Sequence, residues 1–232
     1  MVAIKGLEKF APKDFPGFIS ATIFLPGCGF RCPFCHNPDL VLRPETLADV
    51  PLDFFLAFLD ARREWLEGVC VSGGEPLIHP EVEGLLAVIK ERNLLVKVDT
   101  NGSHPDRLAS LLSAGLVDRI AMDVKAPPER YPEVVRAEAD LEAIARSIEV
   151  VRTSAKPYLF RTTVVPGLVE AEDIGRIGEW LDGAEVFQIQ PFSPLNTLDP
   201  EFERRRPFSR AELKAMADLV RPHFGEVRVE GI

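Results

Sequence analysis

Six short hydrophobic runs, rich in β-branched residues, recur along the chain, and each ends near a glycine, a proline or a polar residue. Runs of this length and composition are typical of buried β-strands. In chain order they cover residues 18–25, 68–72, 94–98, 117–124, 158–165 and 184–190. Residues 227–229 form a shorter run that is a candidate for a seventh strand.

Hydrophobic residues spaced three and four apart fill most of the gaps between these runs, as in amphipathic helices. The predicted helices cover residues 47–67, 80–92, 105–114, 139–154, 172–181 and 209–221. Short strands that alternate with helices predict parallel β-α-β units. About six such units favour an α/β fold of the partial (β/α)6 type, a TIM-like barrel open on one side. A doubly wound sheet is the alternative.

No low-complexity linker interrupts the chain, so residues 1–232 are expected to form a single domain. Its core covers residues 18–192, and a C-terminal helix and short strand follow over residues 209–229.

The composition, with 46% hydrophobic and 27% charged residues, excludes a disordered or collagen-like chain. A net charge of −9 without a Lys/Arg tract argues against nucleic-acid binding. No hydrophobic run reaches the roughly 20 residues that a membrane span requires, and the N-terminus lacks a signal pattern. We therefore expect a cytoplasmic protein with no membrane or nucleic-acid partner.

Polar or glycine-containing clusters follow directly after the predicted strands. These clusters are Cys28 to Cys35, Gly73 to Glu75, Asp99 to Gly102, Lys125 and Gln190. The carboxyl ends of barrel strands share one face, where the loops build the active site. Residues distant in sequence are therefore expected to converge there.

Three of the four cysteines, Cys28, Cys32 and Cys35, lie within eight residues at spacings of four and three. Soft thiolates at this spacing suit an iron–sulfur cluster or zinc. A structural zinc site would need His36 as its fourth ligand, but His36 adjoins Cys35 and both could reach one ion only with strain. The loop thus favours a four-iron cluster with one iron free of protein ligands, over zinc or a disulfide.

The C-x3-C-x2-C loop, with Phe34 before the third cysteine and Gly73-Gly74-Glu75 after the second strand, resembles the radical S-adenosylmethionine (SAM) superfamily. The resemblance implies that the three cysteines hold a [4Fe–4S] cluster whose open iron binds SAM. It also implies that Phe34 lies near the adenine, while the two glycines and Glu75 approach the methionine part of SAM.

Further motifs resemble the glycyl-radical-enzyme activating enzymes within that superfamily. They are Cys35-His36-Asn37-Pro38-Asp39, Asp99-Thr100-Asn101-Gly102, Asp123-Val124-Lys125 and the stretch from Arg161 to Pro166. The resemblance implies that Lys125 meets the SAM carboxylate, and that Asp99 and Asn101 contribute to the cofactor site, Asp99 at the ribose or a nearby cation. It implies reductive cleavage of SAM and abstraction of a hydrogen from a glycine of a partner enzyme.

Two stretches, Asp14-Phe15-Pro16-Gly17 and residues 188–192, resemble the activating proteins of anaerobic ribonucleoside-triphosphate reductase more than the pyruvate formate-lyase activators. We therefore expect that reductase as the glycyl radical partner, and reduced flavodoxin or a ferredoxin-type protein as the electron donor. Pyruvate formate-lyase is the alternative partner. A small-molecule radical SAM enzyme, such as a deazapurine synthase, is a further alternative.

Other reactive side chains receive ordinary structural interpretations. Cys70 lies between two valines of a predicted strand and is expected to be a buried, apolar cysteine. His79 and His104 precede prolines and are interpreted as surface or capping residues. His36 is expected either to tune the cluster or to handle protons. The arginine-rich residues 201–206 are interpreted as a solvated face or the rim of a partner interface.

Overall fold

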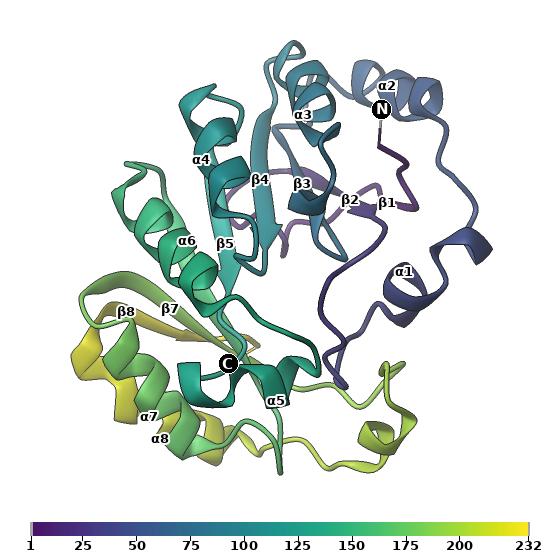
Figure 1. Cartoon of the computed structure of the whole chain (residues 1–232). Coiled ribbons are helices and arrows are strands. Elements are labelled where there is room, and N and C mark those ends of the chain that lie inside the picture. Colours follow the sequence, from purple (N-terminus) through teal and green to yellow (C-terminus); the bar gives the residue numbers. More distant parts are fainter. Residues whose placement is uncertain (1, 232) are drawn as a thin grey trace.

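A computed structural model describes residues 2–231, and eight strands in it form one sheet whose spatial order follows the sequence (Figure 1). Strands β2 to β8 pair in parallel, and β1 pairs with β2 in the antiparallel direction. The strands are β1 (Gly6–Glu8), β2 (Ser20–Leu25), β3 (Gly68–Gly73), β4 (Leu95–Thr100), β5 (Arg119–Asp123), β6 (Tyr158–Val164), β7 (Ala184–Pro191) and β8 (Phe224–Val229).

Helices connect the successive parallel strands and lie on the outer face of the curved sheet (Figure 1). They are α1 (Pro38–Leu42), α2 (Leu52–Asp60), α3 (Val82–Lys90), α4 (Pro105–Ser113), α5 (Tyr131–Val135), α6 (Leu141–Thr153), α7 (Ala171–Trp180) and α8 (Arg210–Val220). Within the described residues, β1 and β8 are the two edges of the sheet and do not pair with each other. The predicted partial, open TIM-like barrel is confirmed, and the short run at residues 227–229 is part of β8.

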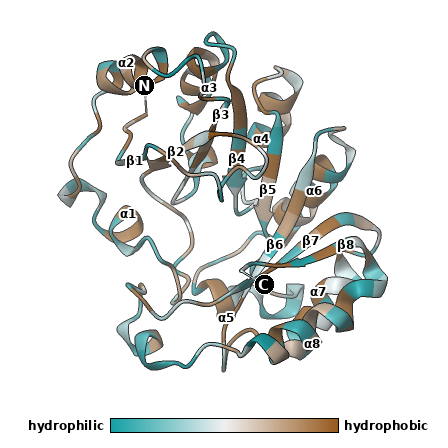
Figure 2. Cartoon of the chain, turned by 180° about the vertical axis from the view of Figure 1, so that it is seen from behind, coloured by the Kyte–Doolittle hydropathy of each residue, from teal (hydrophilic) through white to brown (hydrophobic). Residues whose placement is uncertain are grey.

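Each longer helix buries one stripe against the sheet. In α8, Leu213, Met216, Ala217 and Val220 are buried, at the three- and four-residue spacing of one helical face. Figure 2 shows hydrophobic and hydrophilic residues alternating along this helix. Burying this stripe, rather than helix propensity, holds such a short helix in place. No helix in residues 2–231 has the length and apolar character needed to cross a bilayer.

The predicted helix over residues 47–67 is wrong in its extent, because α2 covers only Leu52–Asp60. Pro51, at the N-cap of α2, lacks a backbone N–H and disfavours helical geometry in the residue before it. Val50 accordingly forms an extended bridge to Ile4. The three-residue strand β1 was not predicted, because it is too short to show a period of two.

The Asp14-Phe15-Pro16-Gly17 motif closes the amino-terminal end of the barrel. Phe15 is buried and packs edge-on against Phe18, with ring centroids 4.9 Å apart. A β-carbon on Gly68, the first residue of β3, would lie 2.9 Å from the Phe15 ring. Arg119, the first residue of β5, donates to the Pro16 carbonyl over 2.8 Å. The motif therefore lies at the opposite end of the strands from the polar clusters.

Candidate active site

The polar clusters after the strands converge on one cavity at the carboxyl end of the barrel, as the strand order predicts. Nine of the ten predicted site residues line it: Cys28, Cys32, Phe34, Cys35, Gly73, Gly74, Asp99, Asn101 and Lys125. Glu75 is the exception. The polar part of the lining is completed by His36, Asn37, Ser72, Thr100, Asp123, Arg161, Thr163 and Gln190.

The three clustered cysteines lie on the loop between β2 and α1, and none forms a disulfide. The Asn101 amide donates to the Cys28 sulfur over 3.6 Å, which ties the loop to the end of β4. Burial raises the pKa of each thiol, that of Cys32 to about 12. Burial thus favours the protonated thiol, whereas a bound metal ion favours the thiolate because it stabilises the negative charge directly. Three thiols on one cavity, with no fourth cysteine beside them, fit an iron–sulfur cluster with one open iron.

Two glycines let the end of β3 approach the cysteine loop closely. Gly73 has a φ of +122°, which side chains rarely adopt, and a β-carbon on Gly74 would lie 1.9 Å from the Gly27 carbonyl oxygen. The Gly74 N–H donates to Leu25 over 2.9 Å, and the Glu75 N–H donates to Gly27 over 2.8 Å. The glycine pair thus fixes the loop that carries Cys28.

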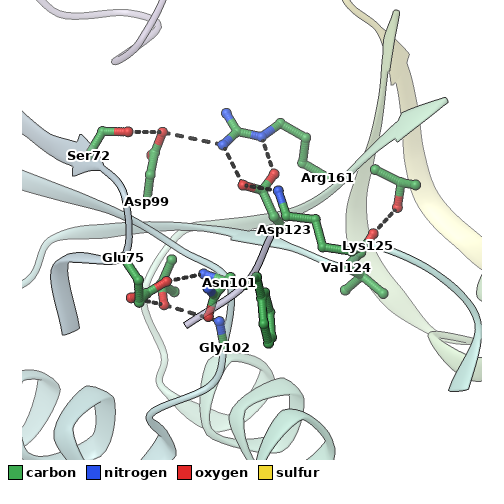
Figure 3. Close-up of polar contacts among 12 residues, drawn as sticks. Ser72, Glu75, Asp99, Asn101, Gly102, Asp123, Val124, Lys125 and Arg161 are labelled. Carbon is green, nitrogen blue, oxygen red and sulfur yellow. Dashed lines mark hydrogen bonds and ion pairs between the residues drawn. The ribbon is translucent and has the colours of Figure 1, made fainter. Parts of the chain in front are cut away.

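Glu75 does not line the cavity, and its predicted contact with SAM stays a prediction. Its side chain is fully buried and accepts hydrogen bonds from the Leu77 N–H (3.0 Å), the Thr100 hydroxyl (2.8 Å) and the Asn101 N–H (2.6 Å). Burial raises the pKa of Glu75 to about 7, although these three donors favour its ionised form. Glu75 joins the end of β3 to the loop after β4 (Figure 3).

Five charged side chains on strands β4 to β6 and just after β5 contact one another with alternating sign, and we call them the charge ladder. They are Lys97, Asp99, Arg161, Asp123 and Lys125. Arg161 donates to Asp123 over 2.7 Å and to Asp99 over 3.4 Å, and Lys125 lies 3.1 Å from Asp123 (Figure 3). Lys97 forms an ion pair with Asp99.

Burial disfavours every charge in the ladder, but the neighbouring opposite charges outweigh it. The pKa values of Asp99 and Asp123 therefore lie below their ordinary range, and those of Lys97 and Lys125 lie above it. All five groups are charged at neutral pH. The cavity can therefore offer both cations and carboxylates to a zwitterionic ligand.

Comparisons with known proteins identify the family. The model of the radical SAM superfamily matches residues 22–181. A Methanocaldococcus jannaschii protein named as a glycyl-radical enzyme activating enzyme is 31% identical over 99% of this chain and 96% of its own length. The chain belongs to the radical SAM superfamily.

Pyruvate formate-lyase-activating enzymes are more distant relatives within this superfamily. That of Streptococcus mutans is 26% identical over 83% of this chain and 78% of its own length. Among solved structures, Streptococcus suis SuiB superposes with a TM-score of 0.66, 14% identity, and coverage of 92% of this chain and 48% of that one. Coproporphyrinogen III oxidase from Escherichia coli superposes with a TM-score of 0.60 and 16% identity, over 86% of this chain and 51% of that one. These two structural matches support the fold alone.

This radical SAM enzyme uses a [4Fe–4S] cluster and SAM, as its family does. Its relatives place it with the glycyl-radical-enzyme activating enzymes. The soft donors of the cysteine loop fit the cluster, and the ladder beside them fits the charged amino-acid part of SAM.

Ser72, Thr163 and Arg161 line the cavity of this radical SAM enzyme, yet sequence reasoning did not place them in the site. For Arg161 a signal existed, because a charged side chain between the buried Phe160 and Thr162 of a central strand needs a charged partner. Thr163 lies in the stretch from Arg161 to Pro166 that resembles the activating enzymes, but that stretch was given no site role. Ser72 gave no signal, because small hydroxyl residues are common in strands of any kind.

Cys70 and the histidines have more specific neighbours than predicted. Cys70 is buried as expected, but its sulfur lies 3.6 Å from both Lys97 Nζ and Asp99 Oδ1, so its surroundings are not apolar. The His79 ring hydrogen bonds with the Pro26 carbonyl over 2.7 Å, just before the cysteine loop. His36 stacks on Phe192 with ring centroids 6.4 Å apart.

Proposed function

We propose that this enzyme activates anaerobic ribonucleoside-triphosphate reductase by removing one hydrogen atom from a glycine of that partner. The observation that carries the proposal is one cavity, at the open carboxyl end of the barrel, that combines three cysteine thiols with four members of the charge ladder: Asp99, Asp123, Lys125 and Arg161. The similarity to a protein named as a glycyl-radical enzyme activating enzyme supports the choice of a glycine as the target.

In this proposal Cys28, Cys32 and Cys35 hold the [4Fe–4S] cluster. Bound there, the cluster would supply the one electron needed for the reductive cleavage of SAM, which would provide the radical that removes the hydrogen. The chain's own contribution is to orient SAM and to keep water away from the radical. Phe34, which is buried on the same loop, offers an apolar surface for the adenine.

The charge ladder receives the methionine part of SAM. Lys125 pairs with the carboxylate, and Asp99 lies within the cavity to accept from the ammonium or a ribose hydroxyl. Asn101 and the backbone of Gly73 and Gly74 complete this wall of the cavity. Glu75 acts as a positioning residue, because it holds the Asn101 backbone by a hydrogen bond of 2.6 Å.

The choice of partner rests on residues 188–192 and on the Asp14–Gly17 motif. Gln190 lines the cavity, so the first stretch is placed to influence what enters it. The second stretch closes the far end of the barrel, and none of its four residues lines the cavity. The preference for the reductase therefore depends on the β7 end, and pyruvate formate-lyase is the second candidate because its activating enzymes are 26–27% identical.

The experiment is anaerobic reconstitution of the cluster, reduction by photoreduced flavodoxin or ferredoxin, and addition of SAM with either candidate partner. We expect a glycyl radical in the electron paramagnetic resonance spectrum of the reductase and none with pyruvate formate-lyase. Cys32→Ala should abolish the signal, whereas Cys70→Ala, which leaves all three loop thiols, should retain it. A signal that survives in Cys32→Ala would reject the cluster assignment, and a signal only with pyruvate formate-lyase would reject the partner.

A further inference from the structure

The segment from Phe192 to Ser209, between β7 and α8, crosses the outside of the cysteine loop. The Leu198 N–H donates to the Cys35 carbonyl over 3.0 Å, and the Asp199 N–H donates to the Pro33 carbonyl over 2.9 Å. In Figure 1 this yellow-green segment passes next to the dark blue loop that follows β2. Anything that docks on this segment therefore approaches the outside of the cysteine loop, at the proposed cluster ligand Cys35.

Five arginines gather where the segment meets the loop, and we call them the arginine patch. They are Arg31, Arg136, Arg204, Arg205 and Arg206. Arg31, between the first two cysteines, is exposed and donates to the Cys28 carbonyl (2.7 Å) and to the Phe30 carbonyl (2.8 Å). The guanidinium groups of Arg136 and Arg205 lie 5.5 and 3.7 Å from the ring centre of Phe202. Arg204 and Arg206 are exposed on the same segment.

The patch is positive although the whole chain carries a net charge of −9. Within residues 2–231, Arg136 is the one member with a carboxylate in ion-pair range, Asp199 at 2.7 Å. The segment from Asp199 to Arg206 adds two exposed glutamates, so five arginines face three carboxylates. Exposed, unpaired guanidinium groups attract an acidic surface and speed its association.

None of the five arginines lines the active-site cavity. A glycine that must meet the radical has to enter that cavity, whereas an electron donor needs only a close approach to the cluster. The outer position of the patch therefore favours the electron donor over the glycyl radical partner. Arg31 strengthens this argument, because its guanidinium is bonded to the backbone of Cys28 itself.

We infer that the arginine patch is the docking surface for an acidic protein that carries a low-potential one-electron centre. This inference rests on the proposed function. On docking, the reduced donor loses one electron and the [4Fe–4S]²⁺ cluster gains it, so the donor leaves oxidised by one electron. The patch guides the acidic donor to the cysteine loop and leaves the cavity free for SAM and the partner's glycine.

The test is charge reversal at the two exposed arginines with no bonding partner among the described residues, Arg204→Glu/Arg206→Glu. The matched control is Lys13→Glu/Arg63→Glu, which changes the net charge equally at exposed positions near the amino-terminal end of the barrel. Acidic flavodoxin serves as the probe. Its Kd for the holoenzyme is measured by biolayer interferometry at several ionic strengths, and the rate of cluster reduction by its hydroquinone is measured by stopped-flow absorbance.

We expect the patch variant to bind flavodoxin about tenfold more weakly, with a flatter dependence of Kd on salt and slower cluster reduction. Reduction by dithionite, and the 5′-deoxyadenosine formed with it, should match the wild type. An unchanged Kd, an equal loss in the control variant, or weakened binding of the glycyl radical enzyme alone would overturn the inference. Absence of 5′-deoxyadenosine with dithionite in the wild type would instead reject the proposed function.

Discussion

At the scale of single residues, the site depends on buried charges that neutralise one another. Lys97 is only 2% exposed, and its ammonium contacts Asp99 and the Cys70 sulfur. Removing one partner of a buried pair typically costs about 3–5 kcal/mol, because the other charge is left without compensation. Lys97 does not line the active-site cavity, so its effect on the site passes through Asp99.

Replacing Lys97 with Met should make SAM binding dependent on pH. In the wild type, Lys97 and Arg161 hold the pKa of Asp99 below its ordinary value, so Asp99 stays ionised through the neutral range. Without Lys97 that pKa rises, and protonation of Asp99 then begins at a higher pH as the pH falls. We expect the variant to lose about tenfold more SAM affinity than the wild type as the pH falls through the mildly acidic range, by anaerobic calorimetry.

Lys90→Met is the matched control, because Lys90 forms an ion pair with Asp118 outside the cavity, over 2.7 Å. It should leave the pH dependence of SAM binding unchanged. If Lys97→Met binds SAM with the same pH dependence as the wild type, Lys97 has no positioning role.

The raised pKa of Glu75 predicts that the free energy of unfolding decreases as the pH rises. Its pKa in the folded chain is about 7 against an ordinary value of 4.5, so the folded state holds the proton more tightly. The resulting stability is present below the ordinary pKa and is lost as the pH rises through about 7. Glu75→Gln removes the titratable group, so any other change it makes to the free energy of unfolding is the same at every pH. The free energy of unfolding of the wild type should therefore fall by the order of 3 kcal/mol relative to the variant between mildly acidic and mildly basic pH, by urea denaturation. Equal pH profiles of the two proteins would contradict the raised pKa.

At the scale of elements, the site depends on the close approach of the end of β3 to the cysteine loop, which two glycines allow. The end of β3 passes under the cysteine loop, where the Gly27 carbonyl occupies the space that a β-carbon on Gly74 would need. The motif residues and their convergence could be predicted, because parallel strand ends share one edge. The direction of Glu75 could not be predicted, because it depends on donors from Leu77, Thr100 and Asn101 that meet only in the folded chain.

Gly74→Ala tests this contact. The new methyl group would lie 1.9 Å from the Gly27 oxygen, so the end of β3 and the cysteine loop must separate. We expect a loss of stability of about 1–3 kcal/mol and incomplete cluster reconstitution, measured as iron and sulfide per chain. Gly84→Ala in α3 is the control, because nothing lies within 4 Å of its β-carbon. That change should be neutral or stabilising. Full iron content in Gly74→Ala would show that the loop tolerates the separation.

At the scale of the whole molecule, the two ends of the barrel have separate tasks. The carboxyl end carries the cysteines and the charge ladder, and the amino end is closed by the Asp14–Gly17 motif. The order of strands and helices could be predicted from hydrophobic periodicity, which reports which face of an element is buried. The closure by Phe15 could not, because a phenylalanine in a short polar stretch carries no periodic signal and its site is formed by Gly68 and Arg119 from distant strands.

This division predicts that Phe15→Ala lowers the free energy of unfolding but leaves the rate of SAM cleavage unchanged. Phe15 is 1% exposed, and truncating a buried phenylalanine typically costs about 3–5 kcal/mol. Phe10→Ala provides the matched control, since Phe10 is 60% exposed and should cost little. Urea denaturation measures the stability, and 5′-deoxyadenosine formed with dithionite measures SAM cleavage well below the unfolding temperature. We expect the rate per cluster in Phe15→Ala to equal that of the wild type. A folded Phe15→Ala variant that cleaves SAM slowly would mean that the amino end of the barrel acts on the site through the strands, and that the two ends do not have separate tasks.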